Sequence, residues 1–171
     1  MKIAFYGGET AGVVALLTLL ARKQNVVVIF PQDAKLNLIA EQFKLEQQDK
    51  LQLKNPQYIQ KLSKKVDLII CCHGRLILPN ELVSKVKSIN LHPCLYKYKG
   101  LRPIRQLIAD KNPRASVASH WMIEKIDAGQ TIIEEFKKIE NIQTKTEADI
   151  YNELYPIYVK VLIKTLEKIN I

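Results

Sequence analysis

The N-terminal third of the sequence alternates strand-like and helix-like segments, and this alternation limits the fold more than any other feature. Residues 2–6 form an apolar run that ends at a glycine pair, and residues 10–23 follow with apolar side chains at helical spacing. Residues 26–30 are almost all β-branched or aromatic, and residues 34–43 again have helical periodicity. Two strand–helix units in succession predict an α/β fold with right-handed crossovers and a mostly parallel central sheet.

The remaining segments continue this pattern and then change it. The clearest strand is residues 67–72, where five apolar residues follow one aspartate, whereas residues 45–54 are rich in Gln and Lys and predict at most a short edge strand. Further helices are expected at 56–65, 79–86 and 103–110, and further strands at 89–92, 116–124 and 131–139. The last two strands flank a turn and are typical of antiparallel neighbours. Residues 148–168 predict a closing helix that Pro156 kinks or interrupts.

Size and composition predict one compact domain. The 171 residues are 47% hydrophobic, which is enough for a sizeable core. A net charge of +9 favours anionic partners, although many lysines only solvate exposed faces. The three cysteines are odd in number, and no two have the spacing of a zinc-binding pair, so a reducing cytoplasm is the simplest location. We find no leader sequence and no apolar stretch of about 20 residues, and expect a soluble protein with no membrane partner.

Three polar residues stand out as candidates for chemistry. Asn90 and His92 are two residues apart in an apolar strand, so their side chains should point to the same side. Asp127 lies in the turn between the two antiparallel strands. An amide, an imidazole and a carboxylate can form a proton-handling site, but His73 and His120 compete for the histidine's role, and composition alone does not choose among them. A satisfied core histidine is the alternative interpretation of His92.

The glycine pair after the first strand occupies the position where a dinucleotide-binding fold holds a pyrophosphate at a helix N-terminus. The residues that follow are Glu9, Thr10, Ala11 and Gly12, and the Glu9 carboxylate would repel a phosphate. We therefore interpret the pair as a structural turn and do not expect a nicotinamide cofactor.

The motifs around these residues resemble a known family. Ile89-Asn90-Leu91-His92-Pro93, followed by Cys94-Leu95 and Tyr98-Lys99-Gly100, is similar to the Asn-x-His-Pro-Ser-Leu and Tyr-Arg-Gly signature of formyltransferases that use 10-formyltetrahydrofolate. His120 followed by Asp127-Ala128-Gly129 resembles the family's second block, in which the catalytic aspartate comes seven residues after a histidine. Gly74–Pro79 is similar to the segment that holds the pterin, and Thr144–Tyr151 to the start of the closing helix. The resemblance covers roughly residues 66–155.

The resemblance implies a Rossmann-like formyltransferase fold, with helices on both faces of the sheet and an antiparallel strand pair near its C-terminal half. It implies one catalytic domain, 1–171, with N-terminal βα units in 1–65 and the catalytic, folate-binding half in 66–171. The catalytic residues would be Asn90, His92 and Asp127. The folate donor, 10-formyltetrahydrofolate, would be bound by Arg75, Leu76, Ile77, Leu78, His120 and Ile123. Asn90 and protonated His92 would stabilise the oxyanion, Asp127 would orient His92, and no metal would be needed.

Departures from the family pattern bear on the acceptor. The loop 92–100 is one residue shorter than the family's and lacks its second proline, so acceptor entry is expected to differ. Residues 7–10 do not match the Gly-Asn-Gly-Ser-Asn type phosphate loop of glycinamide ribonucleotide formyltransferases. Residues 98–104 resemble the Tyr-Arg-Gly-x-x-Pro-Ile of methionyl-tRNA and amino-sugar formyltransferases.

A small anionic amine acceptor, such as an amino-sugar nucleotide, is the favoured expectation. A tRNA is less favoured because the sequence ends after its closing helix, without the additional RNA-binding domain that the tRNA enzymes carry. A glycinamide ribonucleotide formyltransferase, a formyltetrahydrofolate hydrolase and a non-catalytic folate-binding module are the remaining alternatives.

Overall fold

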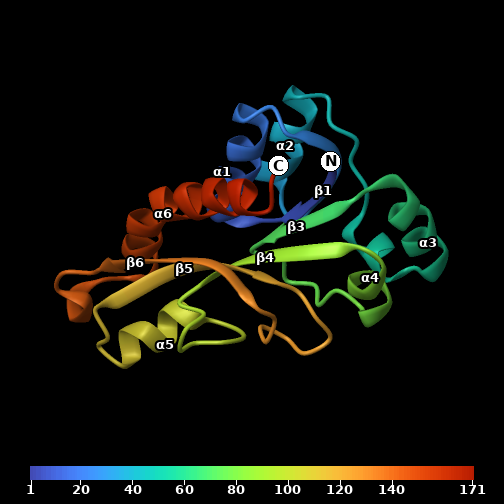
Figure 1. The fold of residues 1–171 in the computed structure, drawn as a ribbon. Helices are drawn as coiled ribbons and strands as arrows, with labels where there is room; N and C mark the ends of the chain where they lie inside the picture. Colours follow the sequence, from blue (N-terminus) through green and yellow to red (C-terminus); the bar gives the residue numbers. More distant parts are fainter.

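Six strands form one sheet in the order β2-β1-β3-β4-β5-β6 in the computed structural model, which describes residues 1–171 (Figure 1). The first four strands run parallel to one another: β1 (Lys2–Gly7), β2 (Asn25–Pro31), β3 (Leu68–Cys72) and β4 (Lys87–Pro93). β5 (Arg114–Trp121) pairs antiparallel with β4, and β6 (Thr131–Lys138) pairs antiparallel with β5. The predicted α/β class, with its antiparallel pair near the C-terminal half, is confirmed.

Helices cover both faces of this sheet. They are α1 (Glu9–Ala21), α2 (Ala34–Gln42), α3 (Pro56–Lys65), α4 (Asn80–Lys85), α5 (Pro103–Ala109) and α6 (Glu147–Lys168), with short 3₁₀ turns η1 (Lys50–Lys54) and η2 (Ile142–Thr144). Because side chains alternate along a strand, Ile3 and Phe5 of β1 enter the core under α1 and α6. Ala4 and Tyr6 enter the smaller core under α3 and α4. None of the helices is long and apolar enough to cross a membrane.

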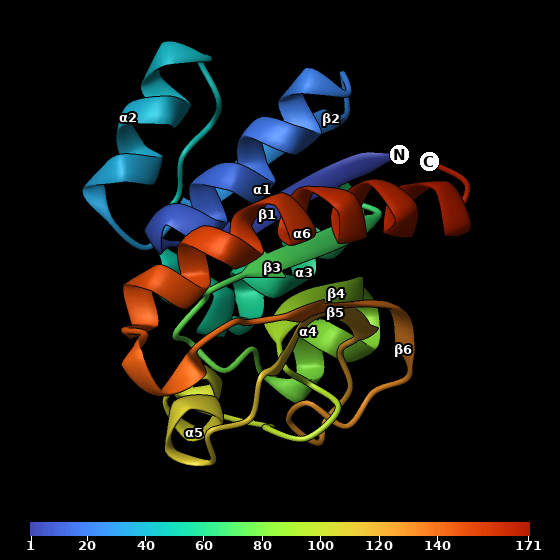
Figure 2. The same cartoon turned by 90° about the vertical axis from the view of Figure 1, so that its left-hand side faces the viewer.

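The closing helix α6 packs the C-terminal end of the chain against its N-terminal part. A capping box between Thr146 and Asp149 starts the helix, and α6 then packs against α1, β5 and β6. Figure 2 shows α6 running alongside α1, with the two termini near each other. The predicted interruption at Pro156 is wrong, because the helix continues through this residue to Lys168. Buried Leu154 and Tyr158 fix the helix on both sides of the proline, and this packing outweighs the missing hydrogen bond.

Two segments differ in detail from their predicted boundaries. The strand expected at 116–124 runs from Arg114 to Trp121, because the Trp121 N–H bonds the Gln130 carbonyl and closes a loop over residues 122–130. In the segment 45–54, one bridge pairs Gln47 with Ile29 at the edge of the sheet, and η1 follows. The long 122–130 loop is therefore available to fold over the sheet beside β4.

Candidate active site

Strand register brings three of the predicted polar residues together on one face of the sheet. On β4, Ile89 and Leu91 point into the larger core, so Asn90 and His92 point to the opposite face, as the sequence predicts. Asn90 lies directly across from His120 of β5, and the Asn90 Nδ2 and His120 Nε2 atoms are 3.3 Å apart. This part of the face borders a cavity lined by the loops around residues 75–78, 98–101 and 122–127 and by Val83 of α4.

The 122–130 loop carries Asp127 back over the sheet to these histidines. The Asp127 carboxylate lies 3.2 Å from His92 Nε2 through Oδ2 and 3.5 Å from His120 Nε2 through Oδ1. Asp127 has a φ of 50°, in the left-handed region that non-glycine residues rarely adopt. Two residues on, a Cβ on Gly129 would lie 1.7 Å from the Trp121 carbonyl oxygen, so only glycine fits there. The turn sequence thus fixes the position of the carboxylate.

The neighbours of His92 favour a protonated ring. Its Nδ1 lies 2.8 Å from the Pro93 carbonyl, and its Nε2 lies 3.2 Å from both the Gly100 carbonyl and Asp127 Oδ2. These partners only accept hydrogen bonds, so the doubly protonated imidazolium satisfies both sites. Burial raises the pKa of Asp127, but its contacts with His120, His92 and the Gly100 N–H outweigh burial and hold that pKa well below its usual range. An anionic carboxylate therefore faces a ring that is 7% exposed.

The amide of Gly100 is a site component that the sequence analysis missed. Its N–H donates to Asp127 Oδ2 at 2.8 Å, so the shortened loop before it holds the carboxylate directly. The loop itself is anchored: the Tyr98 hydroxyl donates to Asp110, and Asn112 Nδ2 donates to the Tyr98 hydroxyl at 3.1 Å. A backbone donor leaves no side-chain signal, although the left-handed φ of +81° requires a glycine-tolerant position.

These groups open into one cavity of about 350 Å³. Its lining includes all nine residues that the sequence predicted for catalysis and folate binding: Asn90, His92, Asp127, Arg75, Leu76, Ile77, Leu78, His120 and Ile123. The lining also has members that the sequence analysis did not identify, chiefly Cys71, Val83, Leu101, Met122 and Ile126. A mostly apolar cavity with a few converging polar groups is the usual form of a small-molecule site.

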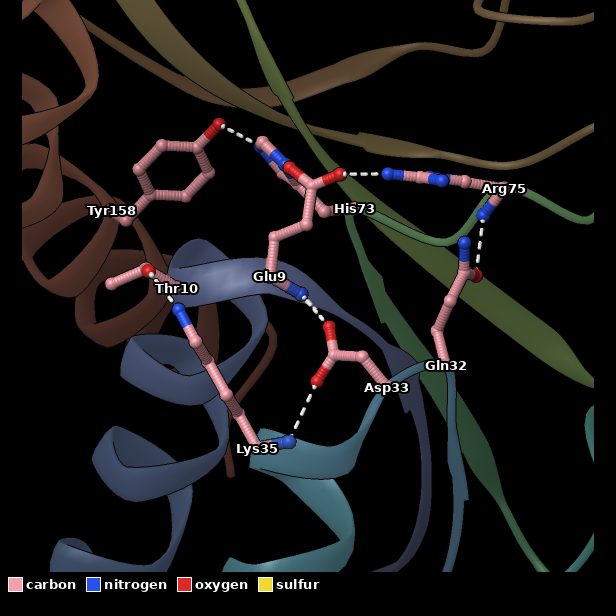
Figure 3. A network of polar contacts seen from close by, with 8 residues as sticks. All are labelled: Glu9, Thr10, Gln32, Asp33, Lys35, His73, Arg75 and Tyr158. Atoms are coloured by element: carbon pink, nitrogen blue, oxygen red, sulfur yellow. Dashed lines mark hydrogen bonds and ion pairs between the residues drawn. The ribbon is translucent and has the colours of Figure 1, made fainter. Parts of the chain in front are cut away.

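His73 lies in a different place from the other two histidines. Its Nδ1 contacts Glu9 at 3.2 Å and its Nε2 contacts the hydroxyl of buried Tyr158 at 2.8 Å (Figure 3). It lines a second cavity, over the ends of β1 and β2, together with Glu9. His73 therefore does not contact Asp127, whereas His120 Nε2 lies 3.5 Å from that carboxylate.

The side chains of the protein include no group of three or more His, Cys, Asp or Glu that could hold a metal ion. The candidate site offers an amide, an imidazole and a carboxylate group. Hydrogen-bond donors on Asn90 and His92 can stabilise a developing negative charge. The Asp127 carboxylate can stabilise the protonated form of the His92 ring.

Comparisons with known proteins agree on the family. The family model described as "Formyl transferase" matches residues 1–166. A methionyl-tRNA formyltransferase from Staphylococcus aureus is 34% identical over 109 residues, which cover 57% of this chain and 35% of that protein. The match thus spans about a third of the length of that curated relative.

Solved structures support the fold. A phosphoribosylglycinamide formyltransferase from Bacillus halodurans has a TM-score of 0.85 at 19% identity, and the superposition covers 99% of this chain and 95% of that one. A sugar N-formyltransferase from Shewanella sp. FDAARGOS_354 has a TM-score of 0.77 at 20% identity, covering 98% of this chain and 68% of that one.

Proposed function

The chain belongs to the formyl transferase family, and on that premise we propose that it transfers the formyl group of 10-formyltetrahydrofolate to a primary amine. The observation that carries this proposal is the placement of the Asp127 carboxylate 3.2 Å from His92, in one cavity with Asn90. The donor would enter the 350 Å³ cavity, with its planar pterin against the apolar segment 76–78. The side chain of Ile123 would close the opposite wall.

The reaction begins when the lone pair of the amine attacks the formyl carbon. The carbonyl π electrons move to the formyl oxygen, which becomes an oxyanion in a tetrahedral intermediate. Asn90 Nδ2 and the protonated Nε2 of His92 are the donors that would stabilise this charge. Asn90 Nδ2 has a second N–H to offer besides the one facing His120, whereas the single N–H on His92 Nε2 must turn from the Gly100 carbonyl and Asp127 Oδ2 to the oxyanion. One such donor contributes about 2.7–4 kcal/mol of transition-state stabilisation.

Protons must then leave the attacking nitrogen and reach the leaving one. Asp127 is the anionic group beside the reacting atoms, and a water held by its carboxylate can take a proton from the attacking amine. The intermediate collapses when the formyl carbon's bond to N10 breaks and N10 takes up a proton, which restores tetrahydrofolate. Throughout, Asp127 keeps His92 charged and oriented.

The favoured acceptor is a small amine, such as an amino-sugar nucleotide. The first βα turn contains Glu9 where a phosphate loop would need donors, which argues against a glycinamide ribonucleotide. A tRNA acceptor is the runner-up because the sequence relatives include a methionyl-tRNA formyltransferase.

The experiment supplies 10-formyltetrahydrofolate with a panel of amines and follows the product masses. We expect one class of amine to gain the mass of a formyl group in place of hydrogen. Substitution Asp127→Asn should lower the rate about 10²–10⁴-fold, while Glu140→Gln, on the exposed surface, should leave it unchanged. Wild-type rates in the Asp127→Asn variant would overturn the mechanism. Consumption of the donor without a formylated amine would indicate a hydrolase instead.

A further inference from the structure

A second cavity adjoins the donor cavity at the segment 73–75. It has a volume of about 560 Å³ and lies over the ends of β1 and β2, next to the first turns of α6. Its lining is Glu9, Thr10, Ala11, Asp33, Ala34, Lys35, His73, Ala148, Tyr151 and Tyr155. His73 and Glu9 line this cavity and Arg75 lines the donor cavity, and the 2.7 Å ion pair between Glu9 and Arg75 shows that the two cavities are neighbours.

The position that an anion would take in this cavity is filled by the chain itself. Asp33 accepts a short hydrogen bond from the Glu9 N–H at the start of α1, and its other oxygen accepts from the Lys35 and Leu36 N–H groups. Gly8 permits this approach, because a Cβ there would lie 2.8 Å from Gln32 Cβ and 3.1 Å from Asp33 Oδ2. A phosphate at the N-terminus of α1 would have to displace this carboxylate.

A second carboxylate, that of Glu9, also disfavours a phosphate in this cavity. Glu9 lies between His73, 3.2 Å away, and Arg75, 2.7 Å away, as Figure 3 shows. The hydrogen bond with His73 lowers the pKa of Glu9 to about 2, with burial opposing and Arg75 assisting, so this group stays ionised at neutral pH. Lys35 is the only lysine or arginine in the lining, and its ammonium is turned to the Thr10 hydroxyl, 3.4 Å away. Within the lining two carboxylates stand against one ammonium, and Arg75, which lies outside the lining, is already paired with Glu9, so the cavity is a poor site for a phosphate dianion.

Part of the cavity lining is aromatic. Tyr151 and Tyr155 of α6 lie with ring planes 20° apart and centroids 6.5 Å apart, and His73 meets the Tyr151 ring edge-on. Aromatic faces accept the C–H surface of a ring, while carboxylates accept hydrogen bonds from hydroxyl groups. A pyranose or furanose ring offers both kinds of group without a negative charge.

We propose that the second cavity binds the acceptor through an unphosphorylated, hydroxyl-rich sugar ring and that Glu9 and Asp33 exclude phosphate monoesters from it. This inference rests on the proposed function and adds the chemical class of the acceptor and its specificity-determining residues. A diphosphate elsewhere in the acceptor would have to lie outside this cavity.

The test compares two probes that differ by one group, D-glucosamine and D-glucosamine 6-phosphate. Their binding to the full chain is measured by ligand-detected NMR titration. We expect glucosamine to bind at least tenfold more tightly than its 6-phosphate. Substitution Glu9→Gln should reduce that preference at least threefold, because it removes one negative charge. Glu41→Gln, at the exposed far end of α2, makes the same change outside the cavity and should leave the preference intact.

Three results would overturn the inference: no binding of glucosamine, equal or tighter binding of the 6-phosphate, or an unchanged preference in a folded Glu9→Gln variant. Asp33→Asn provides a second route to the same answer, because asparagine retains the helix cap of α2 while losing the charge. Tetrahydrofolate binding, titrated in parallel, separates the two proposals. If tetrahydrofolate binds and the glucosamine preference is absent, only the acceptor inference fails. If tetrahydrofolate also fails to bind, the proposed function fails with it.

Discussion

Substitution Gly129→Ala should damage the candidate active site more than the same change at any other glycine. The new Cβ would lie 1.7 Å from the Trp121 carbonyl oxygen and 2.7 Å from its carbon, and both are backbone atoms. One of the two segments must move by about 1.3 Å to reach the 3.0 Å limit for such contacts. Overpacking of this kind costs about 1–3 kcal/mol. The shift also strains the bond from the Trp121 N–H to the Gln130 carbonyl, which contributes about 0.5–1.5 kcal/mol.

The same movement reaches Asp127, two residues away, whose left-handed backbone is fixed by this turn. A misplacement of about 1 Å in a catalytic group can reduce the rate about 10²-fold. Urea unfolding should therefore give a free energy of unfolding about 1.5–4.5 kcal/mol lower, and formyl transfer should fall about 10²-fold at a temperature where the variant is folded. Ala128→Gly is the matched control, since it alters the same turn without adding an atom. A Gly129→Ala protein with wild-type stability and activity would refute the reasoning.

Three further predictions concern stability. Leu162→Ala, in the core face of α6, should lower the free energy of unfolding by about 2–5 kcal/mol in urea titrations, and a loss below about 1 kcal/mol would contradict the assigned packing. Pro156→Ala should raise the melting temperature, because it restores the N–H that can bond the Asn152 carbonyl, and no rise would mean that the helix depends on the proline's geometry. The folded-state pKa of Glu9 is about 2, lowered from 4.5 chiefly by His73, so its contribution to stability is present above about pH 4.5 and is lost as the pH falls toward 2. The free energies of unfolding of wild type and Glu9→Gln should accordingly converge as the pH falls from about 4.5 to 2. A difference in free energy that stays constant over this range would show that the charge of Glu9 does not cause it.

Local sequence pattern was enough for the parts of the fold that depend on local rules. The apolar runs of β1, β3 and β4 predicted buried strands, and the structure has a strand at each of them. The pattern also predicted that Asn90 and His92 share a side, since this follows from strand geometry alone. The pattern predicted a kink or an interruption at Pro156, and the interruption is absent, because packing that only the tertiary structure supplies holds the helix together through the proline.

The candidate site needed more than local pattern. Nothing near Asp127 in the sequence shows that its loop returns to a strand more than 30 residues earlier, and the family motif supplied that link. The Gly100 N–H was missed because it is a backbone group. His73 could be told apart from the other histidines only after α6 placed Tyr158 against it, 85 residues away in the chain. Contacts between residues this far apart in the chain cannot be predicted from local residue spacing.

The position of α6 has a consequence for how the protein is made. This helix is synthesised after all six strands, yet it packs against α1, one of the first elements to leave the ribosome. Until residues 147–168 emerge, the nascent chain leaves an apolar surface of α1 and β5 exposed, and such surfaces recruit chaperones or aggregate. A message truncated before α6 would therefore give a product in which His92, His120 and Asp127 are present but the core is uncovered. Cellular quality control, rather than loss of the site residues, would remove it.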